Sequence, residues 1–266
     1  MKKILTACFI TLSVSLVQAQ SPEGKVIYER VSQVQIRIND IPGMEQQMPR
    51  TRTEKFELIY GKQQSLWKAA EQDNDNDNIT SGEGGMQIRM VSAGSDDVLY
   101  TNFETSKRVE KRELLEKTFI IDDSIRKLKW KMTGETKMIL NRNSMKATAT
   151  DIRTRTQMTM ENGKMERKEV TDTINIVAWF TTEIPVPAGP AEFQGQLPGL
   201  ILEMDVNNGR QVFKALDISA KADVSLIKEP GGKKRYTPEE FRKERDKMFE
   251  EMQRNNQGGN RVIRMQ

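Results

Sequence analysis

Alternating apolar and polar side chains recur along most of the chain and predict β-strands. The first long run, Val26 to Ile38, is rich in β-branched residues, which favour extended backbone. Two shorter runs, 55–60 and 65–69, flank Gly61 and predict a hairpin. Further strands are expected over 86–91 and 98–103.

The clearest alternation lies near the middle of the chain. It consists of Leu128, Trp130 and Met132, with Lys127, Lys129 and Lys131 between them. A strand here would turn the apolar side chains towards a core and the lysines towards water. Gly134 is expected to end this strand, and residues 137–140 are expected to pair back on it. We interpret the lysine row as a solvated sheet face, with contact to an anionic surface as the alternative.

Two Asn-Gly pairs predict further hairpins, because both residues tolerate the positive φ of a type I′ turn. These pairs are Asn162-Gly163 and Asn208-Gly209. The strands that they would join are 154–160 with 165–173 and 200–206 with 211–218. An additional strand is considered over 224–227.

One helix is predicted after a linker rich in Pro, Gly and Lys. Thr237 is a suitable N-cap, Pro238 occupies the first helical position, and Glu240 completes a Thr-x-x-Glu capping box. The helix is expected to run to about Arg254. Its narrow apolar stripe favours packing on the sheet over partner binding. The stripe contains Phe241, Met248 and Met252, with Phe249 beside it.

Together these elements predict a mainly β protein, either a curved antiparallel sheet or a partly closed barrel, with one C-terminal α-helix. We expect a signal peptide at 1–19 and an antiparallel β domain at 20–228, with a flexible loop at 71–85. Residues 229–266 are expected to form a linker, helix and tail that pack on the β domain.

The N-terminus has the pattern of a secretory signal peptide. Lys2-Lys3 precedes an uncharged apolar stretch, Ile4 to Val17, and small residues up to Ala19 mark a cleavage site. Cys8 has too few apolar residues before it for a lipoprotein signal, so we expect no lipid anchor. The protein is therefore predicted to be exported.

The composition excludes several chemistries. The chain has no His, and its single Cys lies in the expected signal peptide. His-dependent nucleophiles, zinc sites built from His or Cys, and disulfides are therefore excluded from the mature chain. The formal net charge is +4, and both signs are interleaved, which argues against nucleic-acid binding. No further apolar stretch is long enough to span a membrane, and no cofactor or metal is expected.

An acidic stretch at 71–85 has a partial likeness to a calcium loop. Oxygen-bearing side chains recur from Asp73 onward, but Asn78 replaces the required Gly and Gly84 replaces the bidentate Glu. We therefore predict a flexible solvated loop rather than a calcium site.

A block of four prolines and three glycines lies between Pro185 and Gly199. Proline lacks the amide N–H that a strand needs, so the block cannot be a regular central strand. We expect a rigid loop that delivers residues 200–202 into the sheet. Its role is either a tight crossover with Trp179 as a core plug, which we favour, or a recognition loop. The candidate binding residues are Trp179, Pro185, Gly189, Pro190, Leu197, Pro198, Gly199 and Leu200.

This block resembles the GLPGLI family, whose namesake motif occurs at 195–201 with one inserted residue, Gln196. Other similar positions are Trp130, 135–137, 146–148, Trp179, 184–185 and 189–190. The resemblance implies an exported protein of Bacteroidota-type bacteria, in the periplasm or at the outer membrane. The family is largely uncharacterised, so the resemblance implies no activity. Members often carry a Cys near the position of Ser144, which argues against a thiol-dependent role here.

Three functions are compatible with these patterns. The leading hypothesis is a non-catalytic accessory of the cell envelope, in which a concave sheet face binds an apolar ligand or a protein segment. The second is a carboxylate-dependent envelope hydrolase, with Glu183 and Glu203 as the candidate pair. The third is a structural partner of an outer-membrane complex that docks through Arg242, Lys243, Arg245 and Lys247. No catalytic residue is assigned, and an enzyme is the less favoured interpretation.

Overall fold

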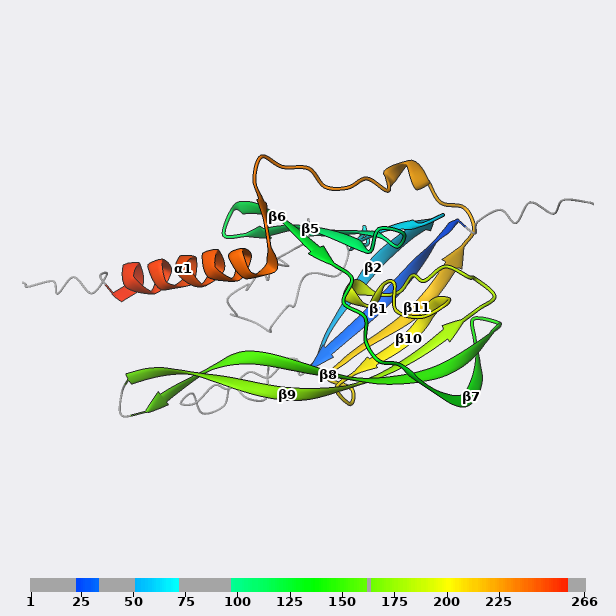
Figure 1. Cartoon of the computed structure of the whole chain (residues 1–266), viewed down its shortest axis with the longest axis horizontal. Coiled ribbons are helices and arrows are strands. Elements are labelled where there is room, and N and C mark those ends of the chain that lie inside the picture. The colour runs from blue at the N-terminus through cyan, green and yellow to red at the C-terminus, as the bar shows by residue number, and fades with distance from the viewer. Residues whose placement is uncertain (1–22, 34–50, 72–96, 162–163, 258–266) are drawn as a thin grey trace, which may run out of the picture.

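The computed structural model describes residues 23–33, 51–71, 97–161 and 164–257 (Figure 1). The expected signal peptide, the strand at 86–91 and the turn at Asn162-Gly163 lie outside the described residues. So does the flexible loop at 71–85 with its calcium-loop likeness, apart from its first residue.

The described residues form a 12-stranded sheet with the order β12-β6-β5-β4-β3-β2-β1-β11-β10-β9-β8-β7. Neighbouring strands are antiparallel except β12 and β6, which are parallel. The strands are β1 (Gly24–Gln33), β2 (Thr51–Gly61), β3 (Gln64–Ala69), β4 (Val98–Asn102), β5 (Lys107–Leu114), β6 (Lys117–Ser124), β7 (Lys131–Ile139), β8 (Arg142–Glu161), β9 (Lys164–Thr181), β10 (Leu200–Val206), β11 (Gln211–Ser219) and β12 (Arg235–Tyr236). Two short 3₁₀ turns, η1 (Ala191–Phe193) and η2 (Val224–Leu226), and the helix α1 (Pro238–Gln257) complete the fold.

The mainly β fold with one C-terminal helix was predicted, and the sheet is not closed into a barrel. Figure 1 shows the sheet bending, so that β5–β6 and β8–β9 lie on either side of the central strands. The predicted hairpins β2–β3, β8–β9 and β10–β11 are confirmed. In the β10–β11 turn, Asn207, Asn208 and Gly209 all have positive φ, and the Gly209 N–H donates to Asp205 Oδ1 at 2.6 Å.

The main core lies against the central strands β1, β2, β9, β10 and β11. Strand alternation places Tyr28, Trp67 and Phe213 together, with the Tyr28 and Trp67 ring centroids 5.4 Å apart. The Tyr28 hydroxyl donates to the Ile201 carbonyl at 2.5 Å, so the one polar atom of this large buried side chain is satisfied. Burial raises the pKa of Tyr28 well above its ordinary value, and the hydroxyl stays protonated.

Smaller apolar clusters lie over the β4–β6 part of the sheet. On one side, the segment that follows β11 packs Ile227 near Ile120. On the other, Phe241 and Met248 of α1 pack against Phe119 and Ile121. The capping box of α1 is formed as predicted: the Glu240 N–H donates to Thr237 Oγ1 and the Thr237 N–H donates to Glu240 Oε2.

Three local predictions were wrong. Residues 125–130 form an extended connection without strand pairing, and β7 begins only at Lys131. Residues 137–140 do not pair back on that connection, because residues 137–139 continue β7 and pair with β8. Residues 224–227 contain the turn η2 instead of a strand. The sequence patterns also missed β5 and β6, whose charged residues obscure the alternation.

The edge strand β7 has an irregular shape. Its pairing with β8 is interrupted between Met132 and Thr136, where Gly134 has a φ of 81°. A β-bulge therefore separates two short paired pieces of this strand. Gly134 was expected to end a strand, and instead it bends one.

We predict that replacing Phe241 with Ala releases α1 from the sheet, because this side chain is 5% exposed and contacts Phe119. Loss of a buried Phe costs about 3 kcal/mol. Hydrogen exchange should accelerate in α1 and β12 but not in β1 or β10. Phe249→Ala is the matched control, since Phe249 is 36% exposed. Equal protection of α1 in both variants would contradict the packing role of Phe241.

Candidate functional site

The block rich in Pro and Gly forms the loop between β9 and β10, here called the Pro/Gly loop (182–199). It makes its own backbone hydrogen bonds, as expected for chain interrupted by proline. The Leu200 N–H donates to the Ile184 carbonyl at 3.1 Å, and the Ile201 N–H donates to the Ala188 carbonyl at 3.0 Å. These bonds hold the loop directly against the start of β10, which agrees with the rigid loop expected from the sequence.

Apolar side chains of the Pro/Gly loop fill the inner side of the curved sheet. The loop residues in the main core are Ile184, Val186, Ala188, Phe193 and Leu197, each at most 6% exposed. Gln194 is also buried; its side-chain oxygen accepts a hydrogen bond from the Ser65 hydroxyl of β3, and its amide donates to the Ala191 carbonyl at 3.1 Å. The loop is therefore part of the core.

Two glycines permit close backbone contacts in this loop. A Cβ on Gly199 would lie 2.1 Å from the Thr181 carbonyl oxygen, so no side chain fits there. Gly195 has a φ of 73°, and a Cβ on it would lie 2.8 Å from the Ile125 side chain. Both positions need glycine for packing, which supports the favoured interpretation of a tight crossover.

The structure separates the eight candidate binding residues. Leu197 and Leu200 belong to the core, and Gly189, Pro190 and Gly199 are buried. Pro185 and Pro198 are exposed. Trp179 is half-buried and packs against the main core, but it alternates with the buried Ala178 and Phe180 and is not a buried core plug.

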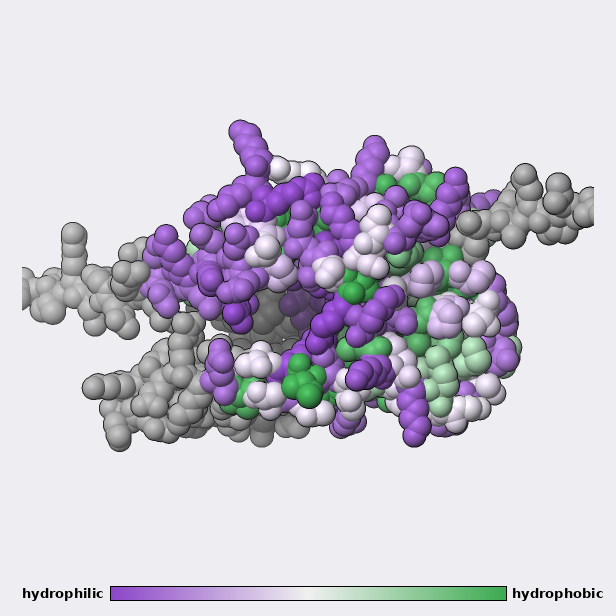
Figure 2. Space-filling view, viewed as in Figure 1, coloured by the Kyte–Doolittle hydropathy of each residue, from purple (hydrophilic) through white to green (hydrophobic). Residues whose placement is uncertain are grey.

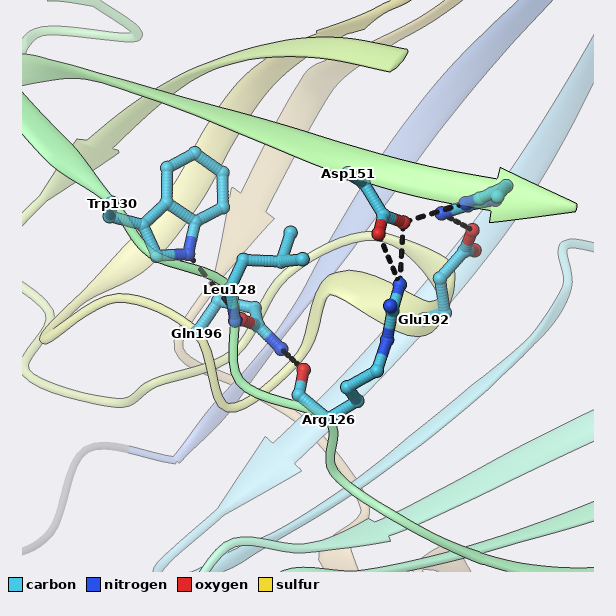
Figure 3. Close-up of polar contacts among 7 residues, drawn as sticks. Arg126, Leu128, Trp130, Asp151, Glu192 and Gln196 are labelled. Atoms are coloured by element: carbon cyan, nitrogen blue, oxygen red, sulfur yellow. Dashed lines mark hydrogen bonds and ion pairs between the residues drawn. The ribbon is translucent and has the colours of Figure 1, made fainter. Parts of the chain in front are cut away.

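A second segment, the strap (125–130), passes over the Pro/Gly loop from β6 to β7 (Figure 3). Gln196 joins the two. Its Oε1 accepts hydrogen bonds from the Leu128 N–H at 3.0 Å and the Trp130 Nε1–H at 3.3 Å. Its Nε2 donates to the Arg126 carbonyl at 2.9 Å. Gln196 therefore ties the loop to the strap.

An ion-pair cluster attaches the strap to β8. Asp151 is 2% exposed, and its carboxylate accepts two hydrogen bonds from Arg126 at 2.6 Å and one from Arg153 at 2.7 Å. Arg153 also pairs with Glu192 of the Pro/Gly loop at 3.4 Å. Burial alone would raise the pKa of Asp151, but the hydrogen bonds and charges of the two arginines outweigh it and lower that pKa. Asp151 is thus an ionised structural anchor.

On the outer side of β9, Trp179 lies beneath two lysines. The Lys137 Nζ is 4.3 Å from the ring centroid and the Lys146 Nζ is 5.8 Å from it. Lys137 pairs with Glu203, and Lys146 pairs with Glu135 at 2.9 Å. Both lysines are ion-paired with a glutamate, so this cluster combines cation–π and ion-pair contacts across β7, β8, β9 and β10.

The candidate carboxylate pair is also held in ion pairs. Glu203 pairs with Lys137, and Glu183 accepts from the Asn143 N–H at 2.8 Å and lies 3.4 Å from Arg142. Each carboxylate therefore has its own cation. Glu183 is held at the β7–β8 turn by Asn143 and Arg142, and Glu203 is paired with Lys137 of β7. This arrangement does not join them into an acid–base pair.

A small cavity of about 120 Å³ lies between β5, β6 and the start of α1. It is lined by Arg108, Glu110, Arg112, Ile121, Asp123, Pro238 and Phe241. Its charges pair with each other, Arg108 with Asp123 and Arg112 with Glu110. Within the described residues, no group of three acidic side chains is placed to bind a metal, and no helix is long and apolar enough to cross a membrane.

Sequence reasoning missed Gln196, Arg126 and Asp151 as organising residues. A signal existed for Asp151, because it follows Ala147 and Ala149 at alternate positions and so falls on their buried side. Gln196 was visible only as an insertion, and the strap was assigned to a strand. The hydrogen bond between Gln196 and Arg126 joins residues 70 positions apart, which no local pattern reveals.

Residues 130–203 match the sequence model of a family described as "Protein of unknown function (Porph_ging)". The matched part begins at Trp130 of the strap and runs through β7, β8, β9 and the Pro/Gly loop into β10. No curated protein matches the sequence.

Two solved structures are similar, both of PNGF-II. The structure in space group C2 has a TM-score of 0.44 and 18% identity, and covers 81% of this chain and 30% of that chain. The structure in space group P21 has a TM-score of 0.48 and 17% identity, and covers 84% and 32%. The chain thus spans about a third of the length of these proteins.

We predict that Gln196→Ala lowers the free energy of unfolding by about 2 kcal/mol, because three hydrogen bonds between loop and strap are lost. Urea unfolding followed by fluorescence measures this change. Thr182→Ala, at an exposed position of the same loop, should change it by less than about 0.5 kcal/mol. If the two variants were equally stable, Gln196 would not organise the strap.

We also predict a pH-dependent contribution from Asp151. Its folded-state pKa is lowered, so its stabilisation is present above the unfolded-state pKa of about 3.9 and is lost as pH falls through the folded-state value. Asp151→Asn, which mimics the protonated acid, should therefore be less stable than the parent at neutral pH, by about 2 kcal/mol. The difference should shrink below about pH 4. Unfolding curves across this range test it, and a constant difference would refute it.

Proposed function

We propose that this protein is an exported, non-catalytic accessory of the cell envelope that binds another protein through the end of the sheet at β7. Export is supported by the signal-peptide pattern of residues 1–19. We further propose that it belongs with the GLPGLI family, because the matched segment 130–203 contains the motif at 195–201.

The observation that carries the binding proposal is an exposed apolar patch, here called the β7 patch. It consists of Met132, Met138 and Leu140, which are 51%, 66% and 41% exposed. These side chains lie within nine residues of chain at one end of the molecule, where Figure 2 shows green gathered over β7. Met132 and Met138 lie opposite Ala147 and Asn143 of β8, so both are on the same side of that strand. Clustered exposed apolar side chains are typical of protein-interaction sites.

The start of the Pro/Gly loop lies at the same end. The Asn143 N–H donates to Glu183, which ties this loop to the β7–β8 turn just after Leu140. Pro185 follows and is exposed. Of the candidate binding residues, Pro185 is therefore exposed two residues from this tie.

A protein partner is favoured over an apolar ligand inside the curved sheet. Such a ligand would have to displace the buried side chains of the Pro/Gly loop, including Ile184, Phe193 and Leu197. Exposing each large apolar side chain costs about 1.5–3 kcal/mol, so the total approaches the whole stability of a typical domain. Surface contact needs no such rearrangement.

The other two functions have weaker support. A hydrolase would need a carboxylate pair, and Glu183 and Glu203 are tied to separate cations. Docking through α1 would use its charged face, where Lys243 pairs with Glu239 at 3.0 Å and Arg245 with Asp246 at 2.9 Å within the helix. Two of the four cations named for docking, Lys243 and Arg245, therefore already have partners.

We predict that a photo-reactive amino acid at Met138 cross-links to an envelope protein in intact cells, whereas the same group at exposed Lys117 does not. Adding Met132→Glu should abolish the adduct, because a charge in an apolar contact disrupts it. Circular dichroism should show the unchanged sheet in this variant. Absence of a Met138-specific adduct, or an unprocessed cytosolic protein, would refute the proposed function.

A further inference from the structure

Methionines gather on one side of the β7–β8 strand pair. The structure describes five methionine side chains: Met132, Met138, Met145, Met204 and Met248. Met132 and Met138 of β7 lie opposite residues 147 and 143 of β8, and Met145 lies midway between those two positions. Because side chains alternate along a strand, residues 143, 145 and 147 point to the same side, and Met145 is a diagonal neighbour of both β7 methionines. Three of the five described methionines therefore share one side of two neighbouring strands.

The methionines of this group are more exposed than the other two. Met138 and Met132 are 66% and 51% exposed, and Met145 is half-buried. Met204 in β10 and Met248 in α1 are only 1% and 8% exposed. An oxidant dissolved in water must contact a thioether to react with it, so it reaches the two methionines of the β7 patch before the buried ones.

The thioether sulfur determines what hydrogen peroxide does at these side chains. The sulfur attacks one oxygen of the peroxide, so that a sulfur–oxygen bond forms, the oxygen–oxygen bond breaks and water leaves. Sulfur is oxidised by two electrons to the sulfoxide, and the peroxide is reduced. The only Cys of the sequence lies in the expected signal peptide, so the expected mature chain has no thiol that peroxide could oxidise instead.

Oxidation changes the chemistry of the β7 patch while its side chains stay in place. A methionine is flexible and apolar, whereas its sulfoxide is polar. A polar group that is buried in an apolar contact without a hydrogen-bond partner weakens that contact. Two of the three side chains of the patch are methionines, and Leu140 is the third. A partner that covers the patch is therefore expected to bind the oxidised protein poorly.

We infer that Met132 and Met138 are a peroxide-sensitive modification site, and that their oxidation to the sulfoxide releases the partner bound at the β7 patch. This inference rests on the proposed function, and it adds redox regulation of that same site. The fold survives the modification, because both side chains are exposed on an edge strand, whereas Met204 of the core and Met248 of the α1 contact are buried.

The first test maps oxidation in the purified protein. After limited treatment with hydrogen peroxide, peptide mass spectrometry should detect sulfoxide at Met132 and Met138 about tenfold faster than at Met204 and Met248. The circular dichroism spectrum should remain that of the unoxidised protein at this stage. Equal oxidation rates at the exposed and buried positions would overturn the inference, and so would loss of the fold.

The second test follows binding in intact cells. The photo-reactive amino acid is placed at Leu140, so that both methionines of the β7 patch remain. Brief peroxide treatment should lower the yield of the adduct about tenfold. The variant Met132→Leu with Met138→Leu keeps apolar side chains of similar volume that form no sulfoxide, and it should retain the adduct after peroxide. Met248→Leu is the matched control at a buried methionine, and it should lose the adduct as the parent does.

Equal loss of the adduct in the parent and in the variant Met132→Leu with Met138→Leu would overturn the inference, because peroxide would then act at another place. An adduct that survives peroxide in the parent would overturn it as well. Both results leave the proposed function standing, since the adduct forms before peroxide is added. A protein that gives no adduct at Leu140 even without peroxide refutes the proposed function, and the inference with it.

Discussion

The fold depends on the burial of the Pro/Gly loop against the inner side of its own sheet. A curved sheet has an apolar concave side that must be covered, and here the cover comes from the chain between two neighbouring strands. The contact is possible because Gly199 lets the loop pass within van der Waals distance of the Thr181 carbonyl.

The strap adds the polar half of this arrangement. Apolar packing fixes where the loop lies, and Gln196 and Asp151 fix which segments it joins. Hydrogen bonds are directional, and a buried carboxylate is costly unless it is paired, so these contacts favour one arrangement of loop, strap and β8 over its alternatives. On the outward side of the strap, Lys127, Lys129 and Lys131 are exposed.

The sequence predicted the strands whose alternation is regular and whose turns contain Asn-Gly, such as β10 and β11. It predicted α1 because capping is local chemistry. It did not predict β5 and β6, where charges occupy both faces, or the strap, whose alternation is real but whose backbone pairs with side chains. Six of the eight candidate binding residues were drawn from the Pro/Gly loop, and most of these are buried, because unusual backbone chemistry marks packing as readily as recognition. The places of Trp179 and Asp151 in the structure depend on contacts with residues distant in sequence, such as Lys137 and Arg126.

The bulge in β7 affects how readily this edge of the sheet can pair with another chain. An uninterrupted outer strand offers its free amides and carbonyls as a template on which further chains polymerise. The bulge at Gly134 interrupts that template, and at the opposite margin β12 contributes only two residues. The margins of the sheet are therefore poor templates for self-association through backbone pairing.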